Sequence, residues 1–235
     1  MRSELYIDEI YGVLTLPEDK NCPLVILVHG YEGSHKDNLN YADAFMKEGI
    51  GSYTFDFSTG SEGIRSKKNE RYSVSSEIEQ LKKVIDYFRD YKSLYLMGES
   101  LGGLVSALCA DEKIKGMMML YPAFSLRDSA HRVFPTRKEI KDTIWLDAWV
   151  GKEFFEAIYD LDIFKEISKY TGKVEIYHGD KDSIVPIKYS YDALDVYKDA
   201  NLIVFEGEEH NWYSPLSDKA AMLMVDFVKR CETCR

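Results

Sequence analysis

A single serine stands between glycines at the point where a buried strand is expected to turn into a helix. The stretch LYLMGESLGGLVSALCA, residues 94–110, is apolar up to Gly98 and then carries Glu99, Ser100 and Gly102 before a helical pattern. Glycines on both sides of a serine let the backbone turn sharply without side-chain clashes. A G-x-S-x-G sequence between a strand and a helix is the nucleophile elbow, which raises the serine Oγ above the edge of a sheet. Ser100 is therefore the predicted nucleophile.

Five histidines are available to act as the base that a serine nucleophile requires. His210, in FEGEEHNWY, lies between the last expected strand and the last expected helix, where the base is expected. His29 and His178 each end an expected strand and precede a glycine, which indicates structural packing. His35 and His131 lie in polar stretches with no orienting context. His210 is therefore the predicted base.

The carboxylate that orients the base is expected in VEIYHGDKDSIVP, residues 174–186, which offers Asp180 and Asp182. We favour Asp182, because it lies further into the loop, just before the next helix. Asp180 is the alternative, but aspartates in turns often bond to nearby backbone groups, and we expect Asp180 to do so.

Two backbone N–H groups are expected to stabilise the oxyanion of the transition state. One is the N–H of Leu101, the residue after the nucleophile, and the other comes from the loop after the strand in PLVILVHG. That loop reads HGYEG, residues 29–33, and the N–H of Tyr31 is the candidate.

Short apolar runs alternate with amphipathic windows along the chain, which is typical of an α/β domain with a mostly parallel central sheet flanked by helices. Residues 23–30 form a continuous apolar run, as expected of a strand buried on both faces. Residues 5–10 and 13–16 are predicted to form an antiparallel pair with a turn at Tyr11-Gly12. Further strands are predicted over 51–57, 94–97, 116–121, 174–178 and 202–205, and helices over 37–48, 75–91, 101–110, 189–197 and 218–230.

Residues 122–171 interrupt this alternation with helical windows, many aromatic residues and no convincing core strand. Insertions of that length in a compact domain often cover an active site, so a largely helical lid is predicted here. The alternative is a small helical addition with its own core. The predicted organisation is a core of residues 1–121 and 172–235 with a lid of residues 122–171.

Composition limits the classes of function. The 235 residues suit one α/β domain, and the net charge of -10 argues against nucleic acid as a partner. No apolar run approaches the ~20 residues needed to span a membrane, and MRSELYIDEIYG has no signal-peptide pattern, so a cytoplasmic protein is expected. The C-x-x-C at residues 231–234 has no second ligand pair nearby, so neither a metal nor a cofactor is expected.

The motifs HGYEG, GESLGG, HGDKDSIVP and GEEHNW occur in the order and spacing of serine α/β-hydrolases. The chain resembles that superfamily over essentially its whole length and looks most similar to bacterial cinnamoyl and feruloyl esterases. The resemblance implies carboxylic ester hydrolysis through an acyl-enzyme on Ser100, with His210 as general base and then acid and Asp182 as its orienting carboxylate. It also implies that Tyr31 and Leu101 supply the oxyanion donors.

The same resemblance suggests substrate contacts in the lid. Feruloyl esterases hold the phenolic hydroxyl with an aspartate and a tyrosine; Asp128 matches the aspartate, but the tyrosine position falls near Phe154-Phe155, where no hydroxyl is available. Trp145, Trp149 and Phe155 are further candidates, since an aromatic pocket suits flat or apolar acyl groups. Relatives commonly carry histidine before the serine, where this chain has Glu99.

The sequence therefore predicts a serine esterase for small acyl or aryl esters, hydroxycinnamate esters included, acting as a monomer or homodimer. A peptidase or amidase of the same superfamily is the first alternative, although many such oligopeptidases carry a propeller domain for which 235 residues leave no room. A non-catalytic binding protein on the same scaffold is the second alternative, since a fold never guarantees a function.

Overall fold

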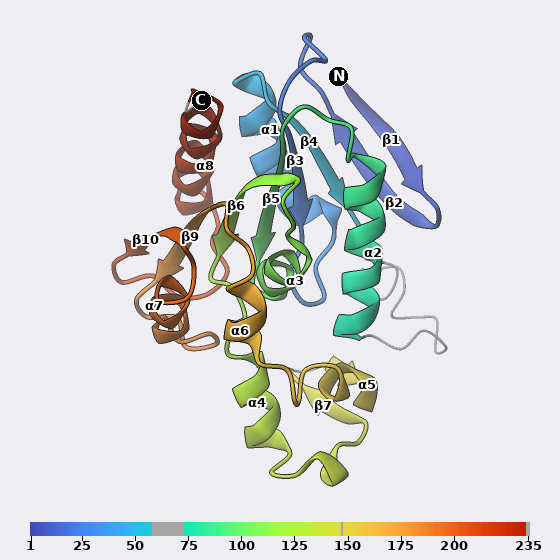
Figure 1. The fold of residues 1–235 in the computed structure, drawn as a ribbon, viewed down its shortest axis with the longest axis vertical. Helices are drawn as coiled ribbons and strands as arrows, with labels where there is room; N and C mark the ends of the chain where they lie inside the picture. The colour runs from blue at the N-terminus through green and yellow to red at the C-terminus, as the bar shows by residue number, and fades with distance from the viewer. Residues whose placement is uncertain (58–72, 147, 234–235) are drawn as a thin grey trace.

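The computed structural model describes residues 1–57, 73–146 and 148–233, and its centre is an eight-stranded sheet (Figure 1). The strand order is β1-β2-β4-β3-β5-β6-β9-β10; β2 pairs antiparallel with β1 and β4, and the remaining pairs are parallel. The strands are β1 (Arg2–Ile7), β2 (Ile10–Thr15), β3 (Leu24–Val28), β4 (Gly51–Phe55), β5 (Leu94–Glu99), β6 (Ile114–Leu120), β9 (Lys173–Gly179) and β10 (Asp199–Phe205). The predicted α/β class with a mostly parallel central sheet is confirmed.

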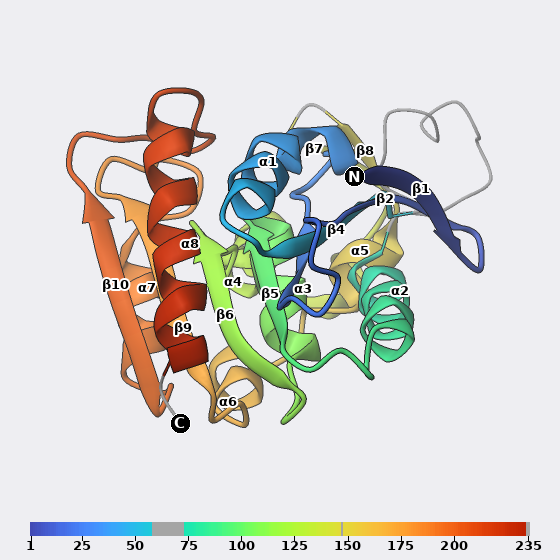
Figure 2. The same ribbon diagram turned by 90° about the horizontal axis from the view of Figure 1, so that it is seen from above.

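Helices cover both faces of the sheet (Figure 2). Along β3 the side chains alternate between the faces, as strand geometry requires: Leu24, Ile26 and Val28 belong to one hydrophobic cluster, and Val25 and Leu27 to the other. The first cluster lies under α2 and α3, the second under α1 and α8. The helices of the core are α1 (Leu39–Lys47), preceded by the 3₁₀ turn η1 (His35–Asn38), α2 (Val74–Tyr87), α3 (Leu101–Cys109), α7 (Lys188–Leu194) and α8 (Leu216–Thr233).

The predicted turn at Tyr11-Gly12 is wrong. The chain reverses at residues 8–9, where Asp8 has a φ of 52°, so that Ile7 pairs with Ile10. Gly12 lies inside β2, and a Cβ there would stand 2.3 Å from the ring of Tyr53. The glycine therefore makes room for an aromatic ring of the neighbouring strand.

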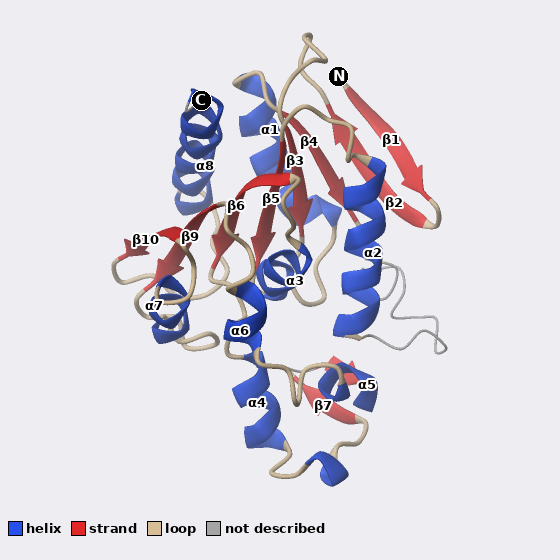
Figure 3. Ribbon diagram, viewed as in Figure 1, coloured by secondary structure: helices blue, strands red, loops and turns tan. Residues whose placement is uncertain are grey.

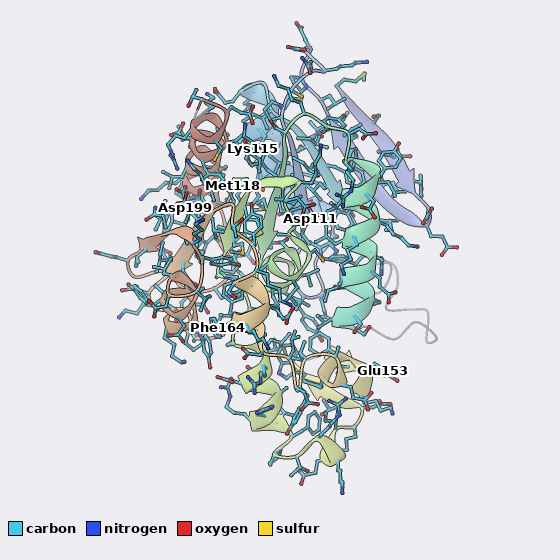
Figure 4. The ribbon with its side chains drawn as sticks, in the orientation of Figure 1. Asp111, Lys115, Met118, Glu153, Phe164 and Asp199 are labelled. Atoms are coloured by element: carbon cyan, nitrogen blue, oxygen red, sulfur yellow. The ribbon has the colours of Figure 1, made fainter. Side chains whose placement is uncertain are left out.

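Between β6 and β9 the chain forms what we call the cap segment, residues 122–171, which lies beyond the carboxyl ends of β3 and β5 (Figures 1 and 3). In Figure 4, Met118 lies within the sheet, whereas Glu153 lies in the cap segment, at the end of the molecule away from the sheet. The elements of the cap segment are α4 (Leu126–Val133), η2 (Arg137–Glu139), β7 (Thr143–Trp145), β8 (Ala148–Val150), α5 (Lys152–Glu156) and α6 (Ile163–Ile167). The hairpin of β7 and β8 was not predicted, because three-residue strands show no alternation.

The cap segment shares its hydrophobic cluster with the sheet. Phe154 and Phe155 are fully buried and belong to the same cluster as Leu24 and Ile26 of β3. Tyr170, at the end of the cap segment, donates a hydrogen bond to the carbonyl of Ile114 at 2.9 Å. The cap segment therefore packs as a continuation of the core.

Within the described ranges, no helix has both the length and the apolar character needed to cross a membrane. The same part of the chain contains no His, Cys, Asp and Glu cluster suited to a metal ion. Cys22, Cys109 and Cys231 are free thiols in buried positions, and Cys234 lies outside the described residues.

The first turn of α3 is pressed against the ends of β3 and β5. A Cβ on Gly102 would lie 2.3 Å from the carbonyl oxygen of His29 and 2.4 Å from that of Val28, and a Cβ on Gly98 would lie 2.4 Å from the carbonyl oxygen of Gly102. Backbone atoms cannot move aside as the end of a side chain can, so neither position accepts any other residue without displacing an element of the fold.

We expect Gly102→Ala to lower the free energy of unfolding by more than about 3 kcal/mol, at the upper end of overpacking effects. Gly103→Ala, one residue further along the same helix, is the matched control, because its Cβ would lie no closer than 3.0 Å to any atom, against 2.3 Å for the Cβ on Gly102. Urea denaturation of both variants measures the difference. Equal stabilities of the two variants would contradict the close approach.

Candidate active site

Ser100 lies at the junction of β5 and α3 with a φ of 50° and a ψ of -116°. Such a conformation is strained for a residue with a side chain and persists only where its surroundings impose it. Here the N–H of Ser100 donates to the carbonyl of Leu120 at 2.9 Å, and its own carbonyl accepts from the N–H of Ala123 at 2.9 Å. The elbow is thus held by the last residue of β6 and by the chain that follows it.

The structure brings Ser100, His210 and Asp182 together. Nε2 of His210 lies 3.0 Å from Oγ of Ser100, and Nδ1 lies 2.6 Å from Oδ2 of Asp182. Because a carboxylate only accepts hydrogen bonds, Nδ1 carries the proton of the neutral imidazole. The lone pair of Nε2 then faces the hydroxyl of Ser100, as a general base must.

Asp182 accepts four hydrogen bonds in a buried position. Oδ1 accepts from the N–H groups of Ile184 at 2.9 Å and Val185 at 2.8 Å, while Oδ2 accepts from His210 and, at 3.2 Å, from His178. Burial raises the pKa of Asp182, but hydrogen bonds from His178, His210 and Val185 outweigh it and hold the pKa well below its ordinary value. Asp182 therefore stays ionised beside the imidazole.

Asp180 has a different partner. Its Oδ1 accepts from the N–H of Gly207 at 2.6 Å, which ties the loop after β9 to the loop after β10. Glu209 repeats this link in the other direction, because its Oε2 accepts from the N–H of Ser183 at 3.0 Å. The two loops that carry Asp182 and His210 are thus bonded to each other.

Aromatic rings pack against the imidazole of His210. The ring centroids of Tyr121 and His210 are 4.3 Å apart, and those of Tyr121 and Trp212 are 5.2 Å apart. Trp212 is anchored by its Nε1–H, which donates to the carbonyl of Glu209 at 2.8 Å. This packing leaves the His210 side chain only 6% exposed, which restricts its rotation.

The two expected oxyanion donors border Ser100, the expected nucleophile. Leu101 is the first residue of α3, so its N–H is one of those that the helix itself leaves without a partner. Tyr31 follows Gly30, whose Cβ position lies 3.4 Å from Cβ of Ser100. Both Tyr31 and Leu101 line a cavity that Ser100 also lines. The ring of Tyr31 packs against Trp145 of the cap segment at 5.3 Å.

Glu99, immediately before Ser100, is in an environment that disfavours its charge. Burial, and to a lesser extent the nearby carboxylate of Asp37, raises the pKa of Glu99 to about 7. Hydrogen bonds from the N–H of Gly30 and the hydroxyl of Tyr121 act in the opposite direction but are weaker. A carboxyl group with this pKa stands half-protonated near neutral pH.

Two cavities meet at Ser100. One is the more enclosed of the two, has a volume of about 40 Å³ and is lined by Trp145, Leu126 and both expected oxyanion residues. The other is wide, has a volume of about 810 Å³ and is lined by His210 and Glu99. We call them the enclosed cavity and the wide cavity.

The expected substrate contacts are placed differently from one another. Trp145 lines the enclosed cavity, but Phe155 is fully buried against Phe134 and Phe154 within the cap segment. Asp128 accepts a hydrogen bond from the hydroxyl of Tyr189 at 2.7 Å, which joins α4 to α7. Neither Asp128 nor Phe155 is among the described residues that line the two cavities. The side chain of Trp149 lies outside the described residues.

The sequence predicted no role at the site for three of its residues, Glu99, Tyr121 and His178. Nothing in the sequence shows that the ring of Tyr121 packs on His210, because the contact joins different loops. The position of His178 at the end of an apolar strand indicated packing, and its Nδ1 indeed lies 2.7 Å from Oγ of Ser190. Its hydrogen bond to Asp182 could be found only from the structure.

Residues 19–161 match the model of the family described as "Serine aminopeptidase, S33". Among solved structures, Est1E from Butyrivibrio proteoclasticus is 20% identical, covers 98% of each chain and gives a TM-score of 0.83. The same protein with ferulic acid bound is 21% identical, covers 97% of this chain and 99% of that one, and gives 0.82. The Paleococcus ferrophilus monoacylglycerol lipase is 20% identical, covers 95% and 99%, and gives 0.72. No curated protein sequence matches. The structural similarities establish an α/β-hydrolase fold.

The raised pKa of Glu99 makes stability depend on pH in a defined direction. Between its ordinary pKa of 4.5 and about 7, the folded state binds more protons at Glu99 than the unfolded state does. The contribution of this group is therefore lost as the pH rises through that window.

We expect Glu99→Gln to raise the free energy of unfolding by about 1–2 kcal/mol at pH 8 and by almost nothing at pH 4.5. The value at pH 8 is discounted from the full pKa shift because the carboxyl group faces a cavity. Urea denaturation at the two pH values measures this, with the exposed Glu112→Gln as control. An equal effect of Glu99→Gln at both pH values would contradict the assigned environment.

Proposed function

We propose that this chain, which belongs to the serine aminopeptidase S33 family and has the α/β-hydrolase fold, is a serine carboxylesterase acting on small acyl or aryl esters. The observation that carries the proposal is the continuous line of hydrogen bonds from Asp182 through His210 to Ser100, at 2.6 Å and 3.0 Å. Each group in this line has the partner that nucleophilic catalysis by serine requires.

In the proposed reaction, Oγ of Ser100 attacks the ester carbonyl while Nε2 of His210 takes the hydroxyl proton. The N–H groups of Leu101 and Tyr31 stabilise the resulting oxyanion. His210 then gives its proton to the alcohol oxygen, the C–O bond breaks and the alcohol leaves. Water, deprotonated by His210, attacks the acyl-enzyme and releases the carboxylic acid and free Ser100, so one ester and one water give one acid and one alcohol.

The ionised carboxylate of Asp182 supports this cycle in two ways. It fixes the proton of His210 on Nδ1, and it stabilises the imidazolium that forms in each half of the reaction. Its four hydrogen bonds keep it charged and immobile.

The cap segment is proposed to act as the lid over this site, with Trp145 as its substrate contact. Its support is the position of Trp145 in the wall of the enclosed cavity. Hydroxycinnamate esters are the finer form of the proposal, supported by the similarity to a structure with ferulic acid bound. The roles of Asp128, Trp149 and Phe155 in binding substrate stay predictions.

The description of the matched family favours a second candidate, an aminopeptidase. Esters and amides are cleaved by the same machinery, but an amine is a poorer leaving group than an alcohol and needs fuller protonation by the base. We expect alanine p-nitrophenyl ester to be cleaved much faster than alanine p-nitroanilide, relative to the uncatalysed rate of each. The kcat/KM values, each divided by its background rate constant, measure this, and preference for the anilide would favour the aminopeptidase.

Replacement of the nucleophile tests the proposal directly. We expect Ser100→Ala to lower kcat for p-nitrophenyl acetate and butyrate by at least about 10³-fold, since the acyl-enzyme cannot form. Ser168→Ala, an exposed serine after α6, is the matched control and should retain full activity. A folded Ser100→Ala protein with near-normal turnover would rule out Ser100 as the nucleophile.

A further inference from the structure

The two cavities at Ser100 cannot receive the two halves of an ester interchangeably, and this inference rests on the esterase function proposed above. In the first half-reaction the proton on Nε2 of His210 must reach the alcohol oxygen, which requires a separation of about 2.6–3.2 Å. The alcohol therefore lies on the side of Ser100 that His210 occupies. His210 lines the wide cavity and is absent from the described lining of the enclosed one.

The acyl group must then extend to the other side. Its carbonyl oxygen has to point at the N–H groups of Leu101 and Tyr31. Leu101 lines only the enclosed cavity, and Tyr31 lies between the two, lining both. The acyl chain leaves the carbonyl carbon on the side opposite the alcohol oxygen, away from His210 and therefore toward the enclosed cavity. The enclosed cavity is thus the acyl site, and the wide cavity is the alcohol site.

The enclosed cavity is small and apolar. Its volume of about 40 Å³ compares with ~150 Å³ for a cavity that holds benzene, so it has room for a short acyl chain and not for an aromatic ring. The inference therefore narrows the proposed function to short acyl groups and excludes its hydroxycinnamate form. The indole of Trp145 forms one wall, held at 5.3 Å by the ring of Tyr31 and at 5.5 Å by that of Phe154. No charged side chain occurs among its described lining residues.

The wide cavity is about 810 Å³ and carries negative charge. Glu99, Asp37 and Asp218 line it, and neither Lys nor Arg does so among the residues that the structure describes. The hydrogen-bond donors to these carboxylates are neutral groups. Glu99 has the N–H of Gly30 and, at 3.4 Å, the hydroxyl of Tyr121; Asp37 has the N–H of Ser34 at 2.7 Å, and Asp218 has the hydroxyl of Ser214 at 2.6 Å.

The charge in the wide cavity is therefore available to a ligand. The rings of Tyr121 and Trp212 also line this cavity, and aromatic faces attract alkylammonium groups. A positively charged alcohol would be favoured at this position by both the carboxylates and the rings.

We propose that the preferred substrates join a short apolar acyl group, held in the enclosed cavity beneath Trp145, to a larger alcohol that carries a positive charge, held in the wide cavity beside His210. Trp145 then determines acyl length, and Asp218 contributes to the recognition of the alcohol. The reaction releases a short carboxylic acid and a cationic alcohol.

The test varies the two halves of the ester separately. p-Nitrophenyl acetate, butyrate and hexanoate change only the acyl group, and choline acetate against 3,3-dimethylbutyl acetate changes only the charge of an alcohol of constant shape. We expect kcat/KM for acetate to exceed that for hexanoate at least tenfold. At low ionic strength, kcat/KM for choline acetate should exceed kcat/KM for 3,3-dimethylbutyl acetate at least tenfold. Added salt should reduce that ratio.

Variants then assign each preference to its cavity. Trp145→Ala should raise the hexanoate-to-acetate ratio at least tenfold without changing the choline preference, and Asp218→Asn should lower the choline preference at least threefold without changing the acyl ratio. Asp226→Asn, exposed on the same helix and outside the wide cavity, is the matched control and should change neither. Should Trp145→Ala fail to fold, Ser129→Leu fills the same cavity from α4 and should lower the butyrate-to-acetate ratio.

The assignment of the cavities is overturned if the wild type lacks either the acyl preference or the charge preference. It is also overturned if each variant changes the preference for the opposite half of the ester. If no ester is hydrolysed, the esterase function itself fails. Alkylboronic acids then still test the acyl site, because boron bonds to Oγ of Ser100 and its alkyl group takes the acyl position. Tighter binding of hexylboronic than of methylboronic acid to the wild type, measured by calorimetry, would overturn the inference without reference to turnover.

Discussion

The close approach of α3 to the ends of β3 and β5 is the constraint on which the site depends. With no room for a side chain at Gly98 or Gly102, the backbone between them takes a single path, and Ser100 accepts a φ of 50°. The packing of the two flanking glycines thus offsets the cost of the strained residue. The same contact places the first N–H of α3, that of Leu101, beside Ser100, so the positions of the proposed nucleophile and of one proposed oxyanion donor follow from one packing contact.

A second close approach fixes the other half of the site. A Cβ on Gly179 would lie 2.1 Å from the carbonyl of Glu208, so the loops after β9 and β10 touch through their backbones. Asp180 and Glu209 bond across this contact in opposite directions. Because β9 and β10 are parallel neighbours in the sheet, both loops leave from the same edge, and the link turns two loops into one rigid support for His210.

Much of this arrangement could be predicted from the sequence, because its signals are local. The glycines around Ser100, the continuous apolar run of residues 23–30 and the place of His210 after the last strand each reflect a nearby physical requirement. The prediction failed where a residue is required by a contact with a residue far away in the sequence. Gly12 was interpreted as a turn glycine, but the ring of Tyr53 requires it. Likewise, the environment of Glu99 depends on Tyr121 and Asp37, which come from other elements, and no pattern around Glu99 indicates them.

Asp182 and Glu99 show how environment separates two carboxyl groups of similar intrinsic acidity. Both are withdrawn from water, but Asp182 accepts four hydrogen bonds and stays ionised, whereas burial and a neighbouring carboxylate raise the pKa of Glu99 to about 7. A group with four donors is fixed in geometry and suited to hold an imidazole. A group with few donors, beside an open cavity, keeps a charge that responds to what enters the cavity. Asp182 bonds to His210, whereas Glu99 lines the wide cavity that His210 also lines, so one carboxyl group fixes the imidazole and the other is exposed to the proposed ligand.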